Sequence, residues 1–392
     1  MSQTIGPTYP SSPPPDSPDQ ASPDALARIT IITPITIVVP TYMERENLPH
    51  LVERIDAVRE ANGLGLELLI MDDNSRDGSK AWAESCGHDW VRLIERSGPR
   101  GLSPAVLDGI RQAKHPVVVV MDADLSHPPE KIPDMVIALN AGQEFVIGSR
   151  YVTGGSTDDE WGFFRWFNSF VATKLAMALT NARDPMAGFF AFRKAELERA
   201  DYLNPVGYKI GLELIVKCRL NNVGEVPIHF TDRVHGESKL TFKEQLKYIK
   251  HLRRLYIYKF GTWSHLAQFL VVGASGVVVN LLVLYALVWI GLHDLVAYAG
   301  GILASVVSNF LLNRRFTFSY ARQGSILKQF TGFVGACSIG IAVQYLVALT
   351  VYHLWADAPL WVPALAGIAA GTAFNFVISR YLVFRTKPNA AP

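Results

Sequence analysis

The sequence predicts an α/β layered domain followed by a helical membrane domain. Between residues 35 and 241, short Val- and Ile-rich runs alternate with segments of helical character, a pattern typical of a layered α/β fold. From about residue 266 onward, four long stretches contain no Asp, Glu, Lys or Arg. At 392 residues, with 49% apolar and only 18% charged residues, the chain is long enough for both domains and low in charge for a soluble protein.

The first part of the chain, residues 1–33, is rich in Pro, Ser and Asp. Such a segment buries too little apolar surface to offset its ordering entropy, so we expect a disordered tail without a function of its own. It lacks the basic and apolar regions of a signal peptide. The three cysteines are far apart in the sequence, which predicts neither a disulfide framework nor a cysteine metal site.

The α/β domain is assigned to residues 34–241. Its strand candidates are 35–40, 66–73, 117–124 and 145–150, and the clearest helix candidate is 48–62. These runs are short, rich in Val and Ile and bounded by turn-forming residues, as buried parallel strands are. Each run ends in polar residues, and ligands bind such sheets at the carboxyl ends of the strands.

The membrane domain is assigned to residues 263–386, with a short tail at 387–392. Its four uncharged stretches are 266–292, 295–313, 329–356 and 358–379. Each has about 18 residues or more, enough to cross a bilayer core of about 30 Å as a helix. The segment NFLLNRRFTF (309–318) aligns with NFVISRYLVF (375–384), which indicates two duplicated helical hairpins.

The distribution of Lys and Arg predicts the topology. Basic residues precede the first span, follow the fourth and occupy the connection between the second and third, whereas the other two connections contain none. The positive-inside rule then places the α/β domain and both termini in the cytoplasm. Residues 242–262 combine apolar and basic residues at helical spacing, which predicts an interfacial amphipathic helix, and the aromatic segment 161–179 is a second candidate.

The acidic residues that follow the strands are the candidates for chemistry. Asp122 and Asp124 follow a buried strand and are separated only by Ala123, and such paired carboxylates suit Mg²⁺ or Mn²⁺ on a diphosphate. Asp72 ends another strand and could accept hydrogen bonds from a base or ribose. The alternative for this second segment is that Asn74, Ser75 or Asp77 caps the following helix. After the first strand, Tyr42 could stack on a base and Glu44 could bind its edge.

A site that binds phosphate groups also requires fixed cations. The candidates are Arg150, Arg165, Arg233 and Lys239, because Arg and Lys bind phosphate well. For each of these residues, the alternative to phosphate binding is an ion pair on the protein surface. A ligand role is favoured most for Arg150, which lies at the carboxyl end of a predicted strand, where ligands bind such sheets.

The motifs VVPTYMERENL, DDNSRDG, MDADLSHPPE, GSRY and GEVPIHFTDRVHGESKL, in this order, resemble the dolichol- or polyprenol-phosphate mannosyltransferases of glycosyltransferase family 2. The resemblance covers about residues 35–241. The membrane part resembles the GtrA-like four-helix domain. The resemblance implies a GT-A (Rossmann-like) fold, GDP-mannose as donor, dolichyl or polyprenyl phosphate as acceptor, Mg²⁺ or Mn²⁺, and inversion at the anomeric carbon.

The resemblance also implies roles for individual residues. The guanosine part would contact Pro40, Tyr42, Glu44, Ile70 and Asp72, and the metal-diphosphate would contact Asp122, Ala123 and Asp124. Phosphates would contact Arg150, Arg233 and Lys239, and the lipid phosphate would also meet Arg165 and Ser169. Ser126 stands where some family members have a Gln that serves as a metal ligand, and because Ser is a poorer ligand, water would complete the metal shell.

The acceptor determines the expected mechanism. A phosphate monoester is largely ionised near pH 7, so it needs no general base, and catalysis would come from positioning and charge stabilisation. One alternative is a glucosyltransferase that uses UDP-glucose. A second is a carrier or flippase of lipid-linked sugar, since duplicated hairpins are compatible with transport. A processive polysaccharide synthase is disfavoured, because no Q-x-x-R-W segment precedes the membrane spans.

Overall fold

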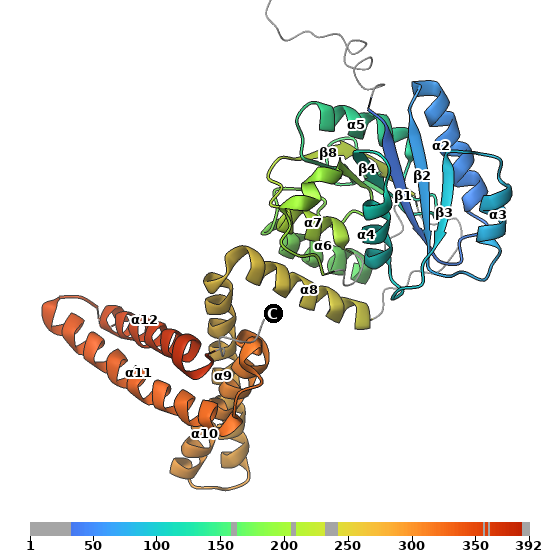
Figure 1. The fold of residues 1–392 in the computed structure, drawn as a ribbon. Coiled ribbons are helices and arrows are strands. Elements are labelled where there is room, and N and C mark those ends of the chain that lie inside the picture. Colours follow the sequence, from blue (N-terminus) through green and yellow to red (C-terminus); the bar gives the residue numbers. More distant parts are fainter. Residues whose placement is uncertain are drawn as a thin grey trace, which may run out of the picture. The chain divides into compact units, whose positions relative to one another are not determined.

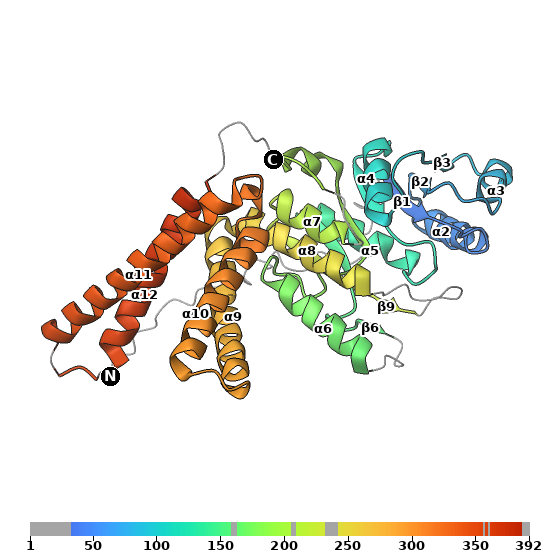
Figure 2. The same ribbon diagram turned by 90° about the horizontal axis from the view of Figure 1, so that it is seen from below.

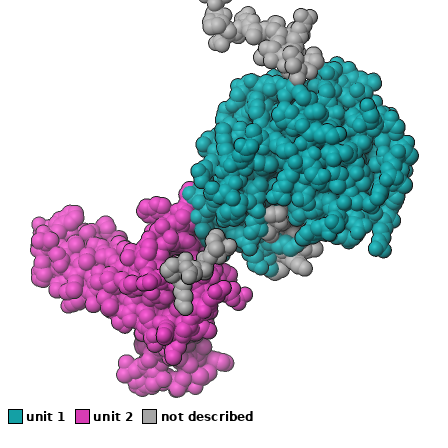
Figure 3. All heavy atoms as spheres, viewed as in Figure 1, with its two compact units in different colours: residues 1–259 teal, residues 260–392 magenta. Residues whose placement is uncertain are grey.

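The computed structural model divides the chain into two compact units, residues 1–259 and 260–392 (Figure 3). The residues that it describes are 33–157, 163–204, 209–231, 242–355, 357–359 and 361–385. Nearly all of the tail predicted at 1–33, and the tail at 387–392, therefore lie outside the described residues.

A seven-stranded sheet forms the centre of the first unit (Figure 1). Its order is β3-β2-β1-β4-β7-β5-β8, and all neighbours pair in parallel except β7, which is antiparallel to both β4 and β5. The strands are β1 (Ile35–Thr41), β2 (Leu66–Asp72), β3 (Val91–Glu95), β4 (Val117–Val120), β5 (Phe145–Ser149), β7 (Phe190–Arg193) and β8 (Val223–Pro227). A separate two-stranded sheet pairs β6 (Ser156–Thr157) with β9 (His229–Phe230).

The four predicted strands correspond to β1, β2, β4 and β5, so the predicted α/β class is confirmed. The other strands were not predicted, because they lack the long apolar runs of the four that were. Strand β3 lies at the sheet edge, is only partly buried and carries charged side chains, so it lacks the continuous apolar run of a buried strand. Strand β7 has only four residues and ends in Arg193.

Helices cover both faces of the sheet. Helices α2 and α5 pack on one face through residues such as Leu51, Ile55 and Met135, whereas α4 and α7 pack on the other through Ile110 and Leu214. Helix α2 has the predicted bounds and ends at Gly63, whose φ of 61° is the left-handed conformation that glycine favours at a helix end. The helices on the two faces are α2 (Leu48–Asn62), α4 (Leu102–Gln112), α5 (Ile132–Asn140) and α7 (Ile210–Lys217), and a short α3 (Ser79–Ser85) precedes β3.

Two further helices, α6 (Phe163–Met177) and α8 (Phe242–Phe260), pack with α7 around a third apolar cluster (Figure 2). Helix α8 contributes Leu252 and Leu255 to this cluster. The predicted linker segment, 242–262, is therefore not separate from the first unit. Its residues up to Lys259 belong to that unit. The outer face of α8 exposes Ile249, which fits the predicted contact with a membrane surface.

The second unit consists of four long apolar helices, α9 (Thr262–Trp289), α10 (Asp294–Leu312), α11 (Ile326–Leu354) and α12 (Trp361–Ile378). By length and composition, each is able to cross a membrane. The first candidate span begins at Thr262, four residues before the stretch predicted from 266.

The two hairpins share local features at the positions that the sequence repeat aligns. Helix α10 ends in a π-helical turn at Asn313–Thr317, and α12 ends in one at Ser379–Val383. In each hairpin a buried glycine of the first helix lies against an asparagine of the second, Gly276 against Asn309 and Gly340 against Asn375. Such small residues allow close helix packing in membranes. The hairpins meet in a phenylalanine cluster, in which Phe318 and Phe384 stack with ring centroids 4.8 Å apart.

Gly340→Val should disrupt the packing of α11 on α12. Its side chain would collide with Asn375, whereas a Cβ at Gly335 on the same helix would meet no atom within 4 Å. We expect Gly340→Val to lower the free energy of unfolding by about 1–3 kcal/mol, as overpacking does, in a denaturation series in mixed micelles. Gly335→Val is the matched control, and equal losses in both variants would contradict the close packing.

Candidate active site

The candidate site lies at the carboxyl edge of the central sheet. Strands β1, β2 and β4 pair in parallel, with Thr41 opposite Asp72 and Val38 opposite Val120, so these strands end at one edge. Strand β5 runs in the same direction, because β7 is antiparallel to both β4 and β5. The polar residues that follow these strands are thereby brought to one side of the first unit, as the sequence predicts.

The turn after β4 places Asp122 and Asp124 differently. The side chain of Asp122 is 29% exposed, whereas Asp124 is buried and its Oδ1 accepts hydrogen bonds from the Ser126 hydroxyl at 2.6 Å and the Ser126 N–H at 3.2 Å. The Asp122 N–H donates to His127 Nδ1 at 3.0 Å. The turn is therefore fixed by its own neighbours, and Asp122 offers the more accessible carboxylate.

His127 is a site residue that the sequence analysis did not assign. Its ring is buried, stacks on Phe189 at 5.3 Å and accepts the Asp122 N–H on Nδ1. Burial lowers the pKa of His127, against the opposing pull of Asp122 and Asp124. The imidazole is therefore neutral near pH 7, and it acts as a support that orients the carboxylate turn.

The donor set suits a hard divalent cation. Mg²⁺ is often held by one or two carboxylates, with substrate phosphates and water completing its shell, and Asp122 with Asp124 can supply the protein part. Among the described residues no group of three or more His, Cys, Asp or Glu gathers as a metal site. The Ser126 hydroxyl donates to Asp124 and so orients that carboxylate, and its role as a metal ligand stays a prediction.

Arg150 forms the buried ion pair of the site, with Asp184. Its Nε lies 2.7 Å from Asp184 Oδ2 and its Nη2 lies 2.9 Å from Oδ1, while its main-chain N–H donates to Oδ2 at 3.2 Å. Asp184 is fully buried. Arg150 thus forms an ion pair, although not the surface pair weighed as the alternative, and its phosphate contact stays a prediction. The remaining Nη1 is the guanidinium nitrogen that the bidentate pair does not use.

Lys209 is a second cation of the site, partly buried, that was not predicted from the sequence. It immediately precedes α7, and its Nζ donates to the Met186 carbonyl at 2.7 Å. Burial and the nearby Arg150 guanidinium lower the pKa of Lys209 to about 8, against the attraction of Asp184 and Asp122. The ammonium thus lies within electrostatic reach of both the carboxylate turn and the ion pair.

The end of the site next to β1 and β2 carries the residues expected to hold a nucleoside. The Tyr42 ring is 43% exposed, and the Arg100 guanidinium lies over it at 4.9 Å. Glu44 Oε2 accepts from Asn47 Nδ2 at 2.7 Å, at the start of α2. An exposed Tyr–Arg stack at a strand end can present a flat, polar surface to a base.

The other predicted nucleoside contacts are embedded in the fold. Asp72 is buried, and its carboxylate accepts from the Thr41 hydroxyl at 3.0 Å and from the Ser75 N–H at 2.7 Å. Ile70 lies in the core, and Pro40 is part of β1. A ligand could therefore reach these residues only through the few atoms that remain exposed at the ends of the strands.

The capping alternative for this segment finds direct support. Asp77 Oδ1 accepts from the Ser79 N–H at 3.1 Å and from its hydroxyl at 2.8 Å, at the first residue of α3. Neighbouring Asp73 pairs with the buried Arg96 and accepts the Gly101 N–H at 2.7 Å. These bonds hold the loop that carries Arg100.

Some predicted ligands cannot be located. Arg233 and Lys239 lie in 232–241, outside the described residues. Arg165 and Ser169 belong to α6, but their side chains are not among those described. Their assignments remain predictions.

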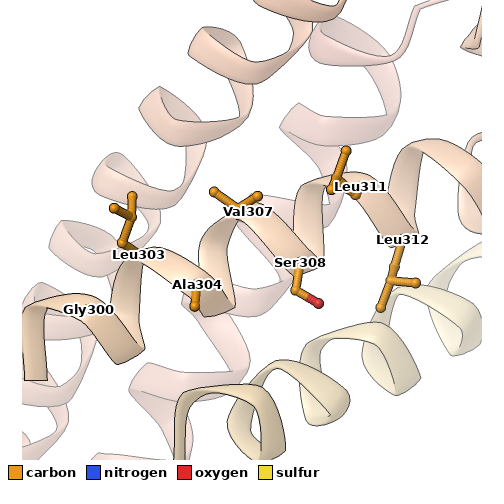
Figure 4. Close-up of a pocket in the computed structure, with 7 residues that line it drawn as sticks. All are labelled: Gly300, Leu303, Ala304, Val307, Ser308, Leu311 and Leu312. Atoms are coloured by element: carbon orange, nitrogen blue, oxygen red, sulfur yellow. The ribbon is translucent and has the colours of Figure 1, made fainter. Parts of the chain in front are cut away.

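The grooves of the second unit are a separate feature. One, of about 560 Å³, lies along α10 and is lined almost entirely by apolar side chains (Figure 4). Ser308 supplies its hydroxyl group, and the remaining lining offers no charged group. Neither this groove nor one of about 480 Å³ lined by α9 and α10 holds residues suited to sugar transfer.

Comparison with known proteins gives the family. The glycosyl transferase family 2 domain matches residues 36–199, and the GtrA/DPMS transmembrane domain matches 268–384. A dolichol-phosphate mannosyltransferase of Pyrococcus furiosus is 36% identical over 362 residues, which cover 90% of this chain and 99% of the relative. The chain belongs to this family. It is therefore a glycosyltransferase with a membrane domain, as the motifs predicted.

Shorter relatives match over half of the chain. The dolichol-phosphate mannosyltransferase of Mycosarcoma maydis is 42% identical over 58% of this chain and 80% of its own length, and that of Saccharomyces cerevisiae is 40% identical over 58% and 88%. Among solved structures, mannosyl-3-phosphoglycerate synthase from Rubrobacter xylanophilus aligns over 60% of this chain and 79% of its own, with 17% identity and a TM-score of 0.49. Glucosyl-3-phosphoglycerate synthase from Mycobacterium tuberculosis, solved with Mn²⁺, UDP and phosphoglyceric acid, aligns over 61% and 82%, with 18% identity and a TM-score of 0.45.

Asp184→Asn should destabilise the first unit. The change leaves the Arg150 guanidinium buried without its counter-charge, which costs about 3–5 kcal/mol in unfolding free energy. Asp134→Asn removes an exposed ion pair with Lys131 and should cost about 0–1 kcal/mol. Chemical denaturation of the full chain in detergent measures both, and a loss for Asp184→Asn no larger than that of the control would refute the role of the buried pair.

Proposed function

We propose that this protein transfers mannose from GDP-mannose to a dolichyl or other polyprenyl phosphate, with inversion, at the cytoplasmic face of a membrane. The observation that carries the proposal is the placement of the partly buried cations Lys209 and Arg150 within electrostatic reach of the Asp122–Asp124 turn. The names of the full-length and catalytic relatives agree with a mannosyl donor and a dolichyl phosphate acceptor.

The donor would lie across the carboxyl edge of the sheet. Its base would meet Tyr42, Glu44 and Arg100, and its diphosphate would extend toward Asp122 and Asp124. A Mg²⁺ or Mn²⁺ ion held by these carboxylates would offset the charge that develops on the departing nucleoside diphosphate. His127 keeps the turn in place through the Asp122 N–H.

The acceptor supplies its own nucleophile. A phosphate oxygen of the lipid attacks the anomeric carbon, and the bond from that carbon to the diphosphate breaks, with both electrons leaving on GDP. One such displacement inverts the anomeric centre. Because the phosphate is already ionised, this chain needs no general base, and its part is to hold two anions together. Lys209 and the Nη1 of Arg150 are the described cations placed to reduce their repulsion.

Donor choice and metal dependence can be tested in one assay. Membranes with the protein and a polyprenyl phosphate should transfer label from GDP-mannose, but not from UDP-glucose, into the lipid fraction. EDTA should abolish transfer and Mg²⁺ or Mn²⁺ should restore it, and Asp124→Asn should lower kcat by about 100-fold or more. Label from UDP-glucose alone would overturn the donor assignment. Lipid translocation without transfer would favour the carrier alternative.

The proposed topology places both termini and the loop between α10 and α11 in the cytoplasm. His293, between α9 and α10, and Ser325, before α11, are both exposed. A cysteine substituted at 293 should react with an impermeant maleimide in intact cells, whereas one at 325 should react only after permeabilisation. The unsubstituted chain, with its three free cysteines, is the reference, and the reverse labelling pattern would refute the orientation.

A further inference from the structure

Helix α8 packs on the elements next to the candidate active site. Its inner face packs on α6 and α7 through Leu252 and Leu255. Its outer face exposes Ile249 and Lys250. The helix therefore lies between the surface of the unit and the elements that carry site residues.

One polar contact runs from Tyr248 to the residue that holds the Lys209 ammonium. The Tyr248 hydroxyl lies 2.8 Å from the Ala172 carbonyl oxygen and 3.2 Å from Met186 Sδ. The main-chain carbonyl of the same Met186 accepts the Lys209 Nζ at 2.7 Å. Tyr248 thus contacts the side chain of a residue whose main-chain carbonyl binds the ammonium.

A second contact runs from His251 to the main chain of Lys209. The buried His251 ring approaches that main chain, and this contact raises the pKa of His251 against the larger lowering effect of burial. The Lys209 carbonyl also accepts the Glu213 N–H, at 3.4 Å, in the first turn of α7. Helix α8 therefore touches Lys209 at its backbone as well as at the support of its side chain.

The charges around His251 are locked in place. Glu213 and Lys217 of α7 are buried and form an ion pair at 2.7 Å, and Glu213 Oε2 lies 3.9 Å from His251 Nδ1. The Lys217 ammonium also lies 4.0 Å from the centre of the Tyr202 ring. With Arg254 of α8 itself, these are the charged groups whose fields reach the imidazole. These contacts favour one position of α8 on α7.

We propose that Tyr248 and His251 are positioning residues, and that the seating of α8 on the catalytic unit sets the place of Lys209 at the active site. The proposal rests on the proposed function only for its effect on turnover. It makes the basic, partly apolar helix that leads into the membrane unit a part of the catalytic apparatus. The lysine it controls lies within reach of Asp122, Asp184 and Arg150.

The first test is kinetic. Tyr248→Phe and His251→Ala in the full chain, in nanodiscs with polyprenyl phosphate, should each lower kcat about five- to tenfold, the effect of one lost hydrogen bond, with a smaller change in the KM for lipid. His251→Gln, which keeps an N–H donor, should recover part of the loss. Tyr256→Phe is the matched control, because that hydroxyl donates to the Leu175 carbonyl instead. Losses equal to the control, or no recovery by Gln, would overturn the proposal.

The second test does not depend on catalysis. Acetylation by acetic anhydride, followed residue by residue with mass spectrometry, should modify Lys209 faster in Tyr248→Phe and His251→Ala than in the unsubstituted chain or Tyr256→Phe. Lys194, whose ammonium donates to the carbonyls of Arg111 and Ala113, is the internal reference for general unfolding. Unchanged Lys209 labelling, or a parallel rise at Lys194, would refute the positioning role. Absent mannose transfer with selective Lys209 labelling would sink only the proposed function.

Discussion

The buried ion pair between Arg150 and Asp184 is the interaction on which the rest of the site depends. Two charges removed from water are tolerated only where good geometry and further hydrogen bonds satisfy them, and Asp184 meets both conditions. Its carboxylate accepts three N–H groups of Arg150, and its own N–H donates to Glu225 Oε1 on β8 at 3.0 Å. The end of β5, the segment before β7 and the edge strand β8 are thereby fixed to one another.

That fixed segment then organises its neighbours. Met186, two residues beyond Asp184, offers the carbonyl that holds Lys209. Gly188 lies where an added Cβ would stand 3.3 Å from His127 and 3.4 Å from Asp122, so the absence of a side chain lets the carboxylate turn sit close to it. The same short stretch thus contacts the ion pair, the Lys209 ammonium and the carboxylate turn. Substrate anions would enter a set of charges whose positions are already determined by the protein, which is how electrostatic preorganisation lowers a barrier.

The sequence alone predicted the features that composition and local order carry. The Val-rich run before Asp122 identified both a strand and the acidic turn, and uncharged length identified the spans. The partners of these residues were out of reach, because they come from distant parts of the chain and follow no periodicity. Asp184 is separated from Arg150 by 34 positions, and nothing local distinguishes Lys209 from a surface lysine. His127 belongs to the motif MDADLSHPPE, so its place beside the acidic turn could have been predicted from the sequence.

The membrane unit has a consequence for how the protein is made. Each hairpin carries its own glycine–asparagine contact, so its two helices are complementary to each other before anything else is present. The stack of Phe318 on Phe384 joins a residue after the second helix to one near the end of the fourth. During synthesis the first hairpin can therefore enter the bilayer as a finished pair, while the aromatic seam closes only when the last helix emerges. The duplicated hairpins thus favour one order in which the membrane unit assembles.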